Sequence, residues 1–157
     1  MLVRLLLMFA LAAWPASAAE WRAYANARFG YAIELPADFI TANEAENGDG
    51  ILLRSQDGRA ELRVFGANIL DHDFATEVDS RRAIDANEGW RISYDKAAPA
   101  WASYSGTRGN RILYVRAVAL CDSAAGYFSL TYLKAERKRY DLIVSHLVKT
   151  LSAPAHC

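Results

Sequence analysis

A series of short strands joined by tight turns constrains the fold of this chain more than any other feature. The clearest case is the segment Ile51 to Phe65, in which Gln56-Asp57-Gly58 supplies a hairpin turn. After the turn, from Arg59 to Phe65, charged residues alternate with small or apolar ones, as expected of a strand with one buried face. Because a tight turn forces its two strands to pair antiparallel, the sequence predicts a β-hairpin here.

Similar strand patterns lie on both sides of this hairpin. Tyr31 to Leu35 is apolar at every second residue, and Pro36, which has no backbone N–H, ends the strand. Trp21 to Tyr24 is either a short edge strand or a lead-in to the fold. Further strands are predicted at Trp90–Asp95, Trp101–Gly106, Arg111–Leu120 and Tyr127–Leu133. Of these, Arg111–Leu120 is apolar on both faces, which predicts a central strand covered on both sides.

Two helices are also predicted. The first follows Asp71-His72-Asp73, where an Asp can cap it, and runs to about Asn87 with an inward face of Phe74, Val78 and Ile84. The second has the apolar spacing of an amphipathic helix at Tyr140, Ile143, Val144, Leu147, Val148 and Leu151. Strands, a helix, more strands and a final helix indicate the α+β class. We expect a mainly antiparallel β-sheet flanked by helices, with a C-terminal amphipathic helix.

The first 18 residues have the pattern of an export signal. Arg4 precedes a short apolar run, Leu5 to Ala13, and Ala16-Ser17-Ala18 is a small-x-small cleavage site. The apolar run is too short for a permanent membrane anchor. We therefore expect residues 1–18 to be a signal peptide and residues 19–157 to form a single domain. The mature protein would be periplasmic or secreted from a bacterium.

The composition of the mature chain bears on its disulfide and its partners. Cys121 and Cys157 remain after cleavage, and an even pair in an exported protein predicts a disulfide, with two free thiols as the alternative. Without Arg4, the chain has 17 basic and 18 acidic residues, a net charge of −1. Because nucleic-acid binding needs a clustered basic excess, nucleic acid is not an expected partner.

Several polar motifs resemble parts of metal or catalytic sites but lack a required residue. Asn47-Gly48-Asp49-Gly50 resembles part of a calcium loop, but Arg54 stands at the twelfth position, where a bidentate Glu is required. The three scattered His residues lack the spacing of zinc ligands. The Gly-x-Ser-x-Gly pattern is absent around Ser105. We therefore expect no metal site, no cofactor and no catalytic residue.

Several short stretches together carry a family resemblance. They are Tyr24-x-Asn26-x-Arg28-Phe29-Gly30-Tyr31-x-Ile33-x-Leu35-Pro36, Asn47–Gly50, the strand after Asp57-Gly58, Ser105-Gly106, Ile112–Tyr114 and Tyr140–Val144. In these turns and strand ends the chain resembles small exported bacterial proteins and is similar in layout to the PsbP/Mog1-like group. The resemblance implies a sandwich of a central antiparallel sheet and flanking helices. It also implies an assembly or interaction protein and supplies no catalytic residue.

The first functional hypothesis is an exported, non-catalytic protein that binds an envelope protein or a small ligand. The binding surface would combine aromatic and arginine side chains near the loops Ala42–Gly50 and Gly106–Asn110. The candidate binding residues at these loops are Asp49, Arg108 and Arg111.

The alternative is an envelope hydrolase with an acid–His or Ser site. It requires an acid or a nucleophile within hydrogen-bond reach of His72 or His146. A third possibility is a stability or stress factor that needs no pocket.

Overall fold

The computed structural model describes residues 20–157, so the predicted signal peptide lies outside the described residues. These residues form nine strands and two α-helices. In chain order they are β1 (Trp21–Ala25), β2 (Ala32–Pro36), β3 (Ile40–Glu44), β4 (Gly50–Arg54), β5 (Glu61–Asn68), α1 (Phe74–Asn87), β6 (Arg91–Ala98), β7 (Trp101–Arg108), β8 (Arg111–Leu120), β9 (Ala124–Leu133) and α2 (Arg137–Thr150). A 3₁₀ turn, η1 (Lys134–Glu136), precedes α2.

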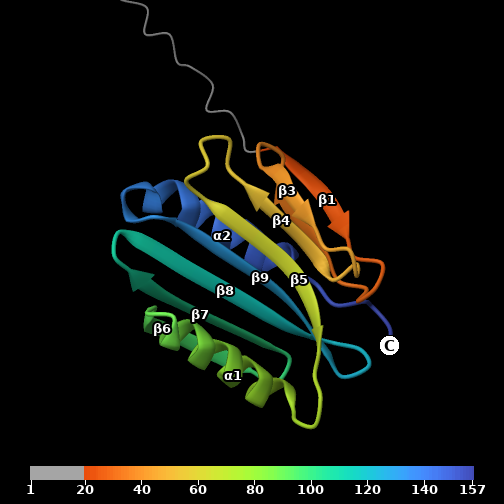
Figure 1. Ribbon diagram of the computed structural model, residues 1–157. Helices are drawn as coiled ribbons and strands as arrows, with labels where there is room; N and C mark the ends of the chain where they lie inside the picture. The colour runs from red at the N-terminus through yellow and green to blue at the C-terminus, as the bar shows by residue number, and fades with distance from the viewer. Residues whose placement is uncertain (1–19) are drawn as a thin grey trace, which may run out of the picture.

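Seven strands form one antiparallel sheet in the order β3-β4-β5-β9-β8-β7-β6 (Figure 1). Every neighbouring pair in this sheet is antiparallel, and β1 and β2 form a separate antiparallel pair. The predicted hairpin is confirmed as β4 and β5, with Arg54 opposite Glu61. The middle strand is β9, because β5 pairs with it and so joins the early strands to the late ones.

The two helices lie on opposite faces of this sheet, and each covers a different half (Figure 1). On the α2 face, α2 and the β1–β2 pair bury a core that includes Leu62, Leu130, Tyr140 and Leu147. On the α1 face, α1 packs over the other half of the sheet. Val78 of α1 belongs to a buried core there that includes Tyr104, Val115 and Tyr127. The two remaining quarters of the sheet surface carry no helix.

Strand β8 is an interior strand, but it is not covered equally on its two faces. Leu113 and Val115 are buried on the α1 face, whereas Ile112 and Tyr114 on the α2 face are only half-buried. The prediction that both of its faces are covered is therefore right for the α1 face, and on the α2 face it holds at Val118 but not at Ile112 and Tyr114. The reason is that α2 lies over β9 and β2, and does not extend across β7 and β6.

Helix α1 begins as predicted and buries less than predicted. Asp73 is its N-cap and accepts a hydrogen bond from the backbone N–H of Thr76 at 2.8 Å. Within the helix Val78 is buried and Phe74 is half-buried. Ile84 is 54% exposed, so its predicted inward position is wrong. It points away from the stripe that contains Val78 and lies beside an open part of the sheet.

Several predicted boundaries differ from the structure; among them, β5 continues to Asn68 and β6 to Ala98. Strand β3 continues to Glu44, so the loop predicted to begin at Ala42 covers residues 45–49. Strand β7 continues to Arg108, which shortens the second predicted loop. Strand β9 begins at Ala124, earlier than predicted. In β3, β7 and β9, pairing with a neighbouring strand accounts for the change in the boundary.

The two cysteines form a disulfide, as predicted. Cys121 follows β8 and Cys157 is the last residue, and their Cα atoms are 5.4 Å apart. The bond therefore ties the end of the chain to the turn between β8 and β9. No helix of the described part of the chain is both long and apolar enough to cross a membrane.

Candidate functional site

The part of the α1 face that α1 leaves open forms a groove of about 640 Å³. We call it the α1-side groove. Its floor is made by β5, β9 and β8, and α1 forms one wall. Aromatic and arginine side chains are prominent in its lining, which includes Phe65, Trp90, Tyr104, Arg63, Arg81, Arg108 and Arg111.

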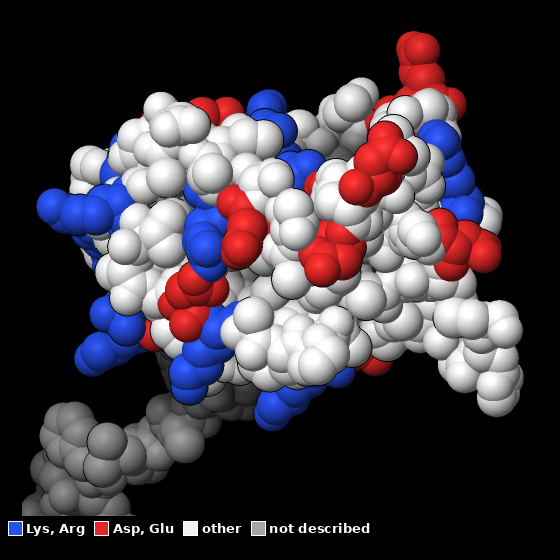
Figure 2. Space-filling view, turned by 90° about the horizontal axis from the view of Figure 1, so that it is seen from below, with Lys and Arg blue, Asp and Glu red and all other residues white. Residues whose placement is uncertain are grey.

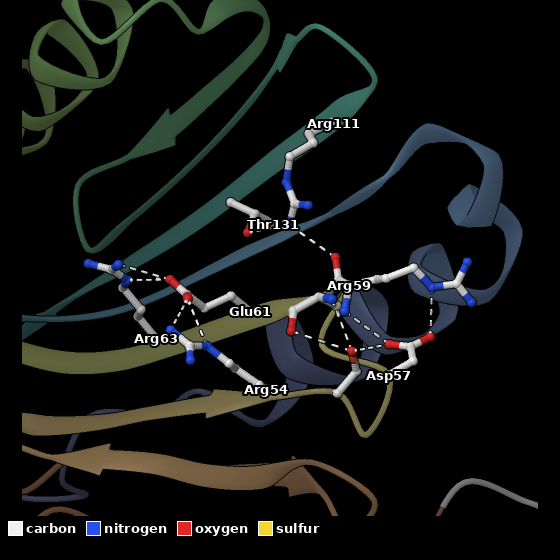
Figure 3. A network of polar contacts seen from close by, with 9 residues as sticks. Arg54, Asp57, Arg59, Glu61, Arg63, Arg111 and Thr131 are labelled. Carbon is white, nitrogen blue, oxygen red and sulfur yellow. Dashed lines mark hydrogen bonds and ion pairs between the residues drawn. The ribbon is translucent and has the colours of Figure 1, made fainter.

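Polar side chains cover the floor of this groove even though it crosses the middle of the sheet. Ser129 and Thr131 lie on the central strand β9, opposite Arg63 and Glu61 of β5, and both are half-buried. Glu61 accepts two hydrogen bonds from Arg63, at 2.9 and 2.8 Å, and two from Arg54, both at 3.3 Å (Figure 3). Burial alone raises the pKa of Glu61, but these arginines outweigh it and lower the pKa.

One end of the floor is held by Arg111 and the β4–β5 turn (Figure 3). Arg111 donates to the backbone oxygen of Arg59 at 3.0 Å and to Oγ1 of Thr131 at 3.3 Å. In the turn, hydrogen bonds from the Ser55 hydroxyl and then from Arg59 lower the pKa of Asp57 to about 2. The hairpin predicted from Asp57-Gly58 therefore also fixes the backbone carbonyl that positions Arg111.

The wall formed by α1 brings a carboxylate and a phenol together. Tyr104 donates a hydrogen bond to Oδ2 of Asp85 at 2.6 Å. Burial raises the pKa of Asp85, despite this bond and the nearby positive charges of Arg81 and Arg108. Burial, together with the hydrogen bond and the charge of Asp85, raises the pKa of Tyr104.

Two further arginines along this wall are held against aromatic rings. The Arg108 guanidinium lies 4.5 Å from the ring centre of Trp90 and donates to the Glu88 carbonyl at 2.8 Å. The Arg81 guanidinium lies 4.9 Å from the ring centres of both Phe65 and Tyr127, which are stacked on each other. Such contacts orient a guanidinium and leave its remaining N–H groups available to a ligand.

The three predicted binding residues all line this groove, but at different places. Arg111 lies near Thr131, and Arg108 precedes it across the β7–β8 turn. Asp49 lies at the other end, where it forms an ion pair with Arg28 at 2.6 Å. A role of these residues in binding stays a prediction. The prediction did not include Arg63, Arg81, Asp85, Tyr104, Ser129 and Thr131, which line the same groove.

A sequence signal for the missed floor residues does exist. Ser129 and Thr131 are hydroxyl residues at alternate positions of a strand whose other face, Phe128, Leu130 and Tyr132, is buried. The pattern indicates a strand with one open face. The wall residues gave no such signal, because their convergence depends on where α1 docks on the sheet.

A second groove, of about 660 Å³, lies on the part of the α2 face that α2 leaves open. It is lined by Tyr94, Ser105, Ile112, Tyr114, Val148 and Lys149 among others. Tyr94, Tyr114 and Phe128 stack in a row, with ring centres 6.4 and 6.0 Å apart. We call it the α2-side groove; the candidate residues Asp49, Arg108 and Arg111 do not line it.

The histidines relevant to a hydrolase each contact a carboxylate outside both grooves. Nε2 of His72 is 2.8 Å from Oε2 of Glu77, and Nε2 of His146 is 2.6 Å from Oε2 of Glu34. The ring of His146 also stacks on Trp21, with centres 3.6 Å apart. The acid–His pairs required by the hydrolase hypothesis are therefore present. Within residues 20–157, however, neither ring is hydrogen-bonded to a Ser, Thr or Cys side chain.

Charges on one face of the molecule are mixed in sign. On the face seen from below in Figure 2, basic and acidic side chains lie next to one another and form no continuous basic patch. In the part of the chain that the structure describes, no three His, Cys, Asp or Glu side chains converge as metal ligands.

Comparison with known proteins relates the chain to others through its structure alone. No family model and no curated protein sequence matches it. It is similar to cyanobacterial PsbP (CyanoP) from Synechocystis sp. PCC 6803, with a TM-score of 0.65 and 14% identity over 90% of this chain and 96% of that one. It is also similar to the Ran-binding protein Mog1p of Saccharomyces cerevisiae, with a TM-score of 0.60 and 9% identity over 86% of this chain and 96% of that one.

A mutant of Mog1 matches in the same way, with a TM-score of 0.59 and 9% identity over 85% of this chain and 95% of the other. At such identities the agreement concerns the arrangement of strands and helices and leaves function open. The protein has the PsbP/Mog1-like α+β fold that its sequence motifs predicted.

Proposed function

We propose that this chain is an exported, non-catalytic protein that binds an envelope protein or a small ligand in the α1-side groove. The observation that carries the proposal is the open, polar floor in the middle of the sheet. An antiparallel sheet can leave one face open to solvent, and polar side chains on a central strand mark the part of that face that no helix covers. Here Ser129 and Thr131 lie half-buried on the central strand, between arginine side chains of β5 and β8.

The composition of the groove supports binding. Phe and Arg are among the residues enriched at protein interfaces, and the half-buried Phe65 and Arg81 line this groove. Its volume of about 640 Å³ also suits a small molecule. The Cys121–Cys157 disulfide supports export, because disulfides persist in oxidising compartments. One protein with the same fold, Mog1p, is described as Ran-binding.

Blocking the floor of the groove tests this proposal. In Ser129→Trp, a large ring would occupy the groove beside Arg63 without replacing a core residue. The matched control is Ser105→Trp, a half-buried serine on the neighbouring part of the sheet that lines the α2-side groove. The purified proteins would be used to capture partners from a periplasmic extract, with mass spectrometry of both proteins and small molecules. Circular dichroism would establish that each variant is folded.

We expect the molecules captured by the unmodified protein to be lost from Ser129→Trp, by about tenfold or more, because a blocked groove loses most of its contact area. Ser105→Trp should retain them. Equal capture by Ser129→Trp, or no reproducible capture by the unmodified protein, would contradict the proposal.

A further inference from the structure

We propose that the α1-side groove binds an extended, acidic segment of a partner protein, an inference that rests on the binding function proposed above. The first observation is a set of arginines without acidic partners. Within residues 20–157, Arg81, Arg108 and Arg111 form no ion pair with a carboxylate. All three line the groove.

The carboxylates at the two ends of the groove are already engaged. Asp49 is held by Arg28 at 2.6 Å, and Glu61 is shared by Arg54 and Arg63. The acidic groups left on the wall are Asp85, which accepts a hydrogen bond from Tyr104, and Glu88. The lining has four arginines and four carboxylates, and Arg28 and Arg54 pair with two of these carboxylates, which makes six positive and four negative groups. The resulting excess of positive charge would be complemented by an anionic occupant.

The arginines are also held in place before any ligand arrives. Aromatic rings support Arg81 and Arg108 from one side, and the Arg59 carbonyl and Thr131 hold Arg111. The Nε of Arg81 is buried and has no hydrogen-bond partner. Guanidinium groups oriented in this way offer paired N–H donors that match the two oxygens of a carboxylate.

The spacing of these arginines selects an extended chain over a single small anion. Arg81 lies over Tyr127, whereas Arg111 contacts Thr131, four residues further along β9. Four residues of a strand span roughly 13 Å, which one carboxylate cannot bridge. An extended peptide of about four residues covers the same length and can present several Asp or Glu side chains.

An NMR titration with a defined acidic peptide tests the inference. The ¹⁵N-labelled protein, recovered from the periplasm after export, would be titrated with hexaglutamate. We expect saturable shifts at backbone amides of β5, β8 and β9 and at the side-chain N–H groups of Arg81 and Arg111, weakened by added salt. Hexaglutamine and glutarate should each bind at least about tenfold more weakly than hexaglutamate. Hexaglutamine lacks the charged side chains, and glutarate is too short to reach both arginines.

Variants identify the groups involved. Arg81→Gln and Arg111→Gln should each weaken hexaglutamate binding by about tenfold, the value of one charge-assisted contact. The matched control is Arg137→Gln, an exposed arginine on α2 that pairs with Asp141 at 3.3 Å, and it should bind normally. Absence of saturable binding, an equal loss in Arg137→Gln, or equally tight binding of glutarate would overturn the inference.

The two proposals fail in different ways. If Ser129→Trp loses its partner but hexaglutamate does not bind, the acidic-segment inference is wrong and the groove remains a binding site. If Ser129→Trp captures its partner normally, the groove is not the binding site and the proposed function is wrong, whatever the peptide does.

Discussion

Gly66 and Gly126 face each other across β5 and β9, yet the space above each one differs. A Cβ atom on Gly66 would overlap the ring of Phe29, which belongs to the turn between β1 and β2. A Cβ atom on Gly126 would lie 3.4 Å from Leu120 and from Tyr31, an ordinary contact. The strand pair therefore needs glycine at one of these positions so that the turn can pack on the sheet.

We predict that Gly66→Ala lowers the free energy of unfolding by about 1–3 kcal/mol, the usual cost of overpacking, because Phe29 must move. Gly126→Ala should change it by less than about 1 kcal/mol, since the added methyl group fits and the unfolded chain loses freedom. Urea denaturation measures both values. Equal costs at the two positions would show that Phe29 is not the cause.

The residues with local roles were predictable from the sequence, and those with distant partners were not. Asp57-Gly58 predicts a turn because turn chemistry depends on adjacent residues. The need for Gly66 arises from Phe29, which is far away in the sequence. Likewise, Arg108 and Arg111 are predictable because they flank a turn, whereas the position of Arg81 depends on the docking of its helix against Phe65 and Tyr127.

At the scale of elements, the two helices are held very differently. Helix α2 buries Tyr140, Ile143, Val144 and Leu147 against the sheet. Helix α1 has the same length but buries Val78 alone. Most of its surface thus remains available, and one side forms the wall of the α1-side groove.

We predict that Val78→Ala lowers the free energy of unfolding by about 1–3 kcal/mol, because it leaves a cavity at the buried contact of α1. Ile84→Ala on the same helix is the control, and we expect a change within about 0.5 kcal/mol because Ile84 is exposed. Chemical denaturation of both variants provides the comparison. A larger effect at Ile84 would mean that α1 packs with a different face.

The error at Ile84 has a geometric cause. Six residues separate it from Val78, which places it roughly 120° away around the helix. The sequence pattern allows a wide inward face, but the helix buries only the narrow stripe with Val78. The strong apolar pattern of α2 left no such freedom, so its predicted face was right.

At the scale of the whole molecule, the disulfide closes the chain across one end of the sheet. Cys157 lies beyond α2 and meets Cys121 at the β8–β9 turn, near the C-terminus marked in Figure 1. Just before it, Ser152 forms an isolated bridge with Ala32 through hydrogen bonds of 3.0 and 2.9 Å. The disulfide and the bridge keep the last segment against β2 and the sheet.

We predict that replacing both cysteines, Cys121→Ser with Cys157→Ser, lowers the free energy of unfolding by about 2–4 kcal/mol, because the unfolded chain gains the freedom of an open loop. The sequence separation of 36 residues sets the size of this loop. Denaturation with and without a reductant measures the effect. Reductant should destabilise the unmodified protein and leave the double variant unchanged. If the double variant is less stable but reductant has no effect on the unmodified protein, the loss of stability comes from the serines and not from the missing disulfide.

The sequence by itself determined the strands of the hairpins, the face of α2, an Asp cap of α1 at either Asp71 or Asp73, and the one possible cysteine pair. Each follows from periodicity, turn chemistry or composition, which act over a few neighbouring residues or over the whole chain. Only the tertiary structure decided that β5 pairs with β9, that β9 lies in the middle, and that the two helices cover opposite halves of the sheet. These outcomes depend on packing between segments far apart in the chain, and the α1-side groove exists because of them.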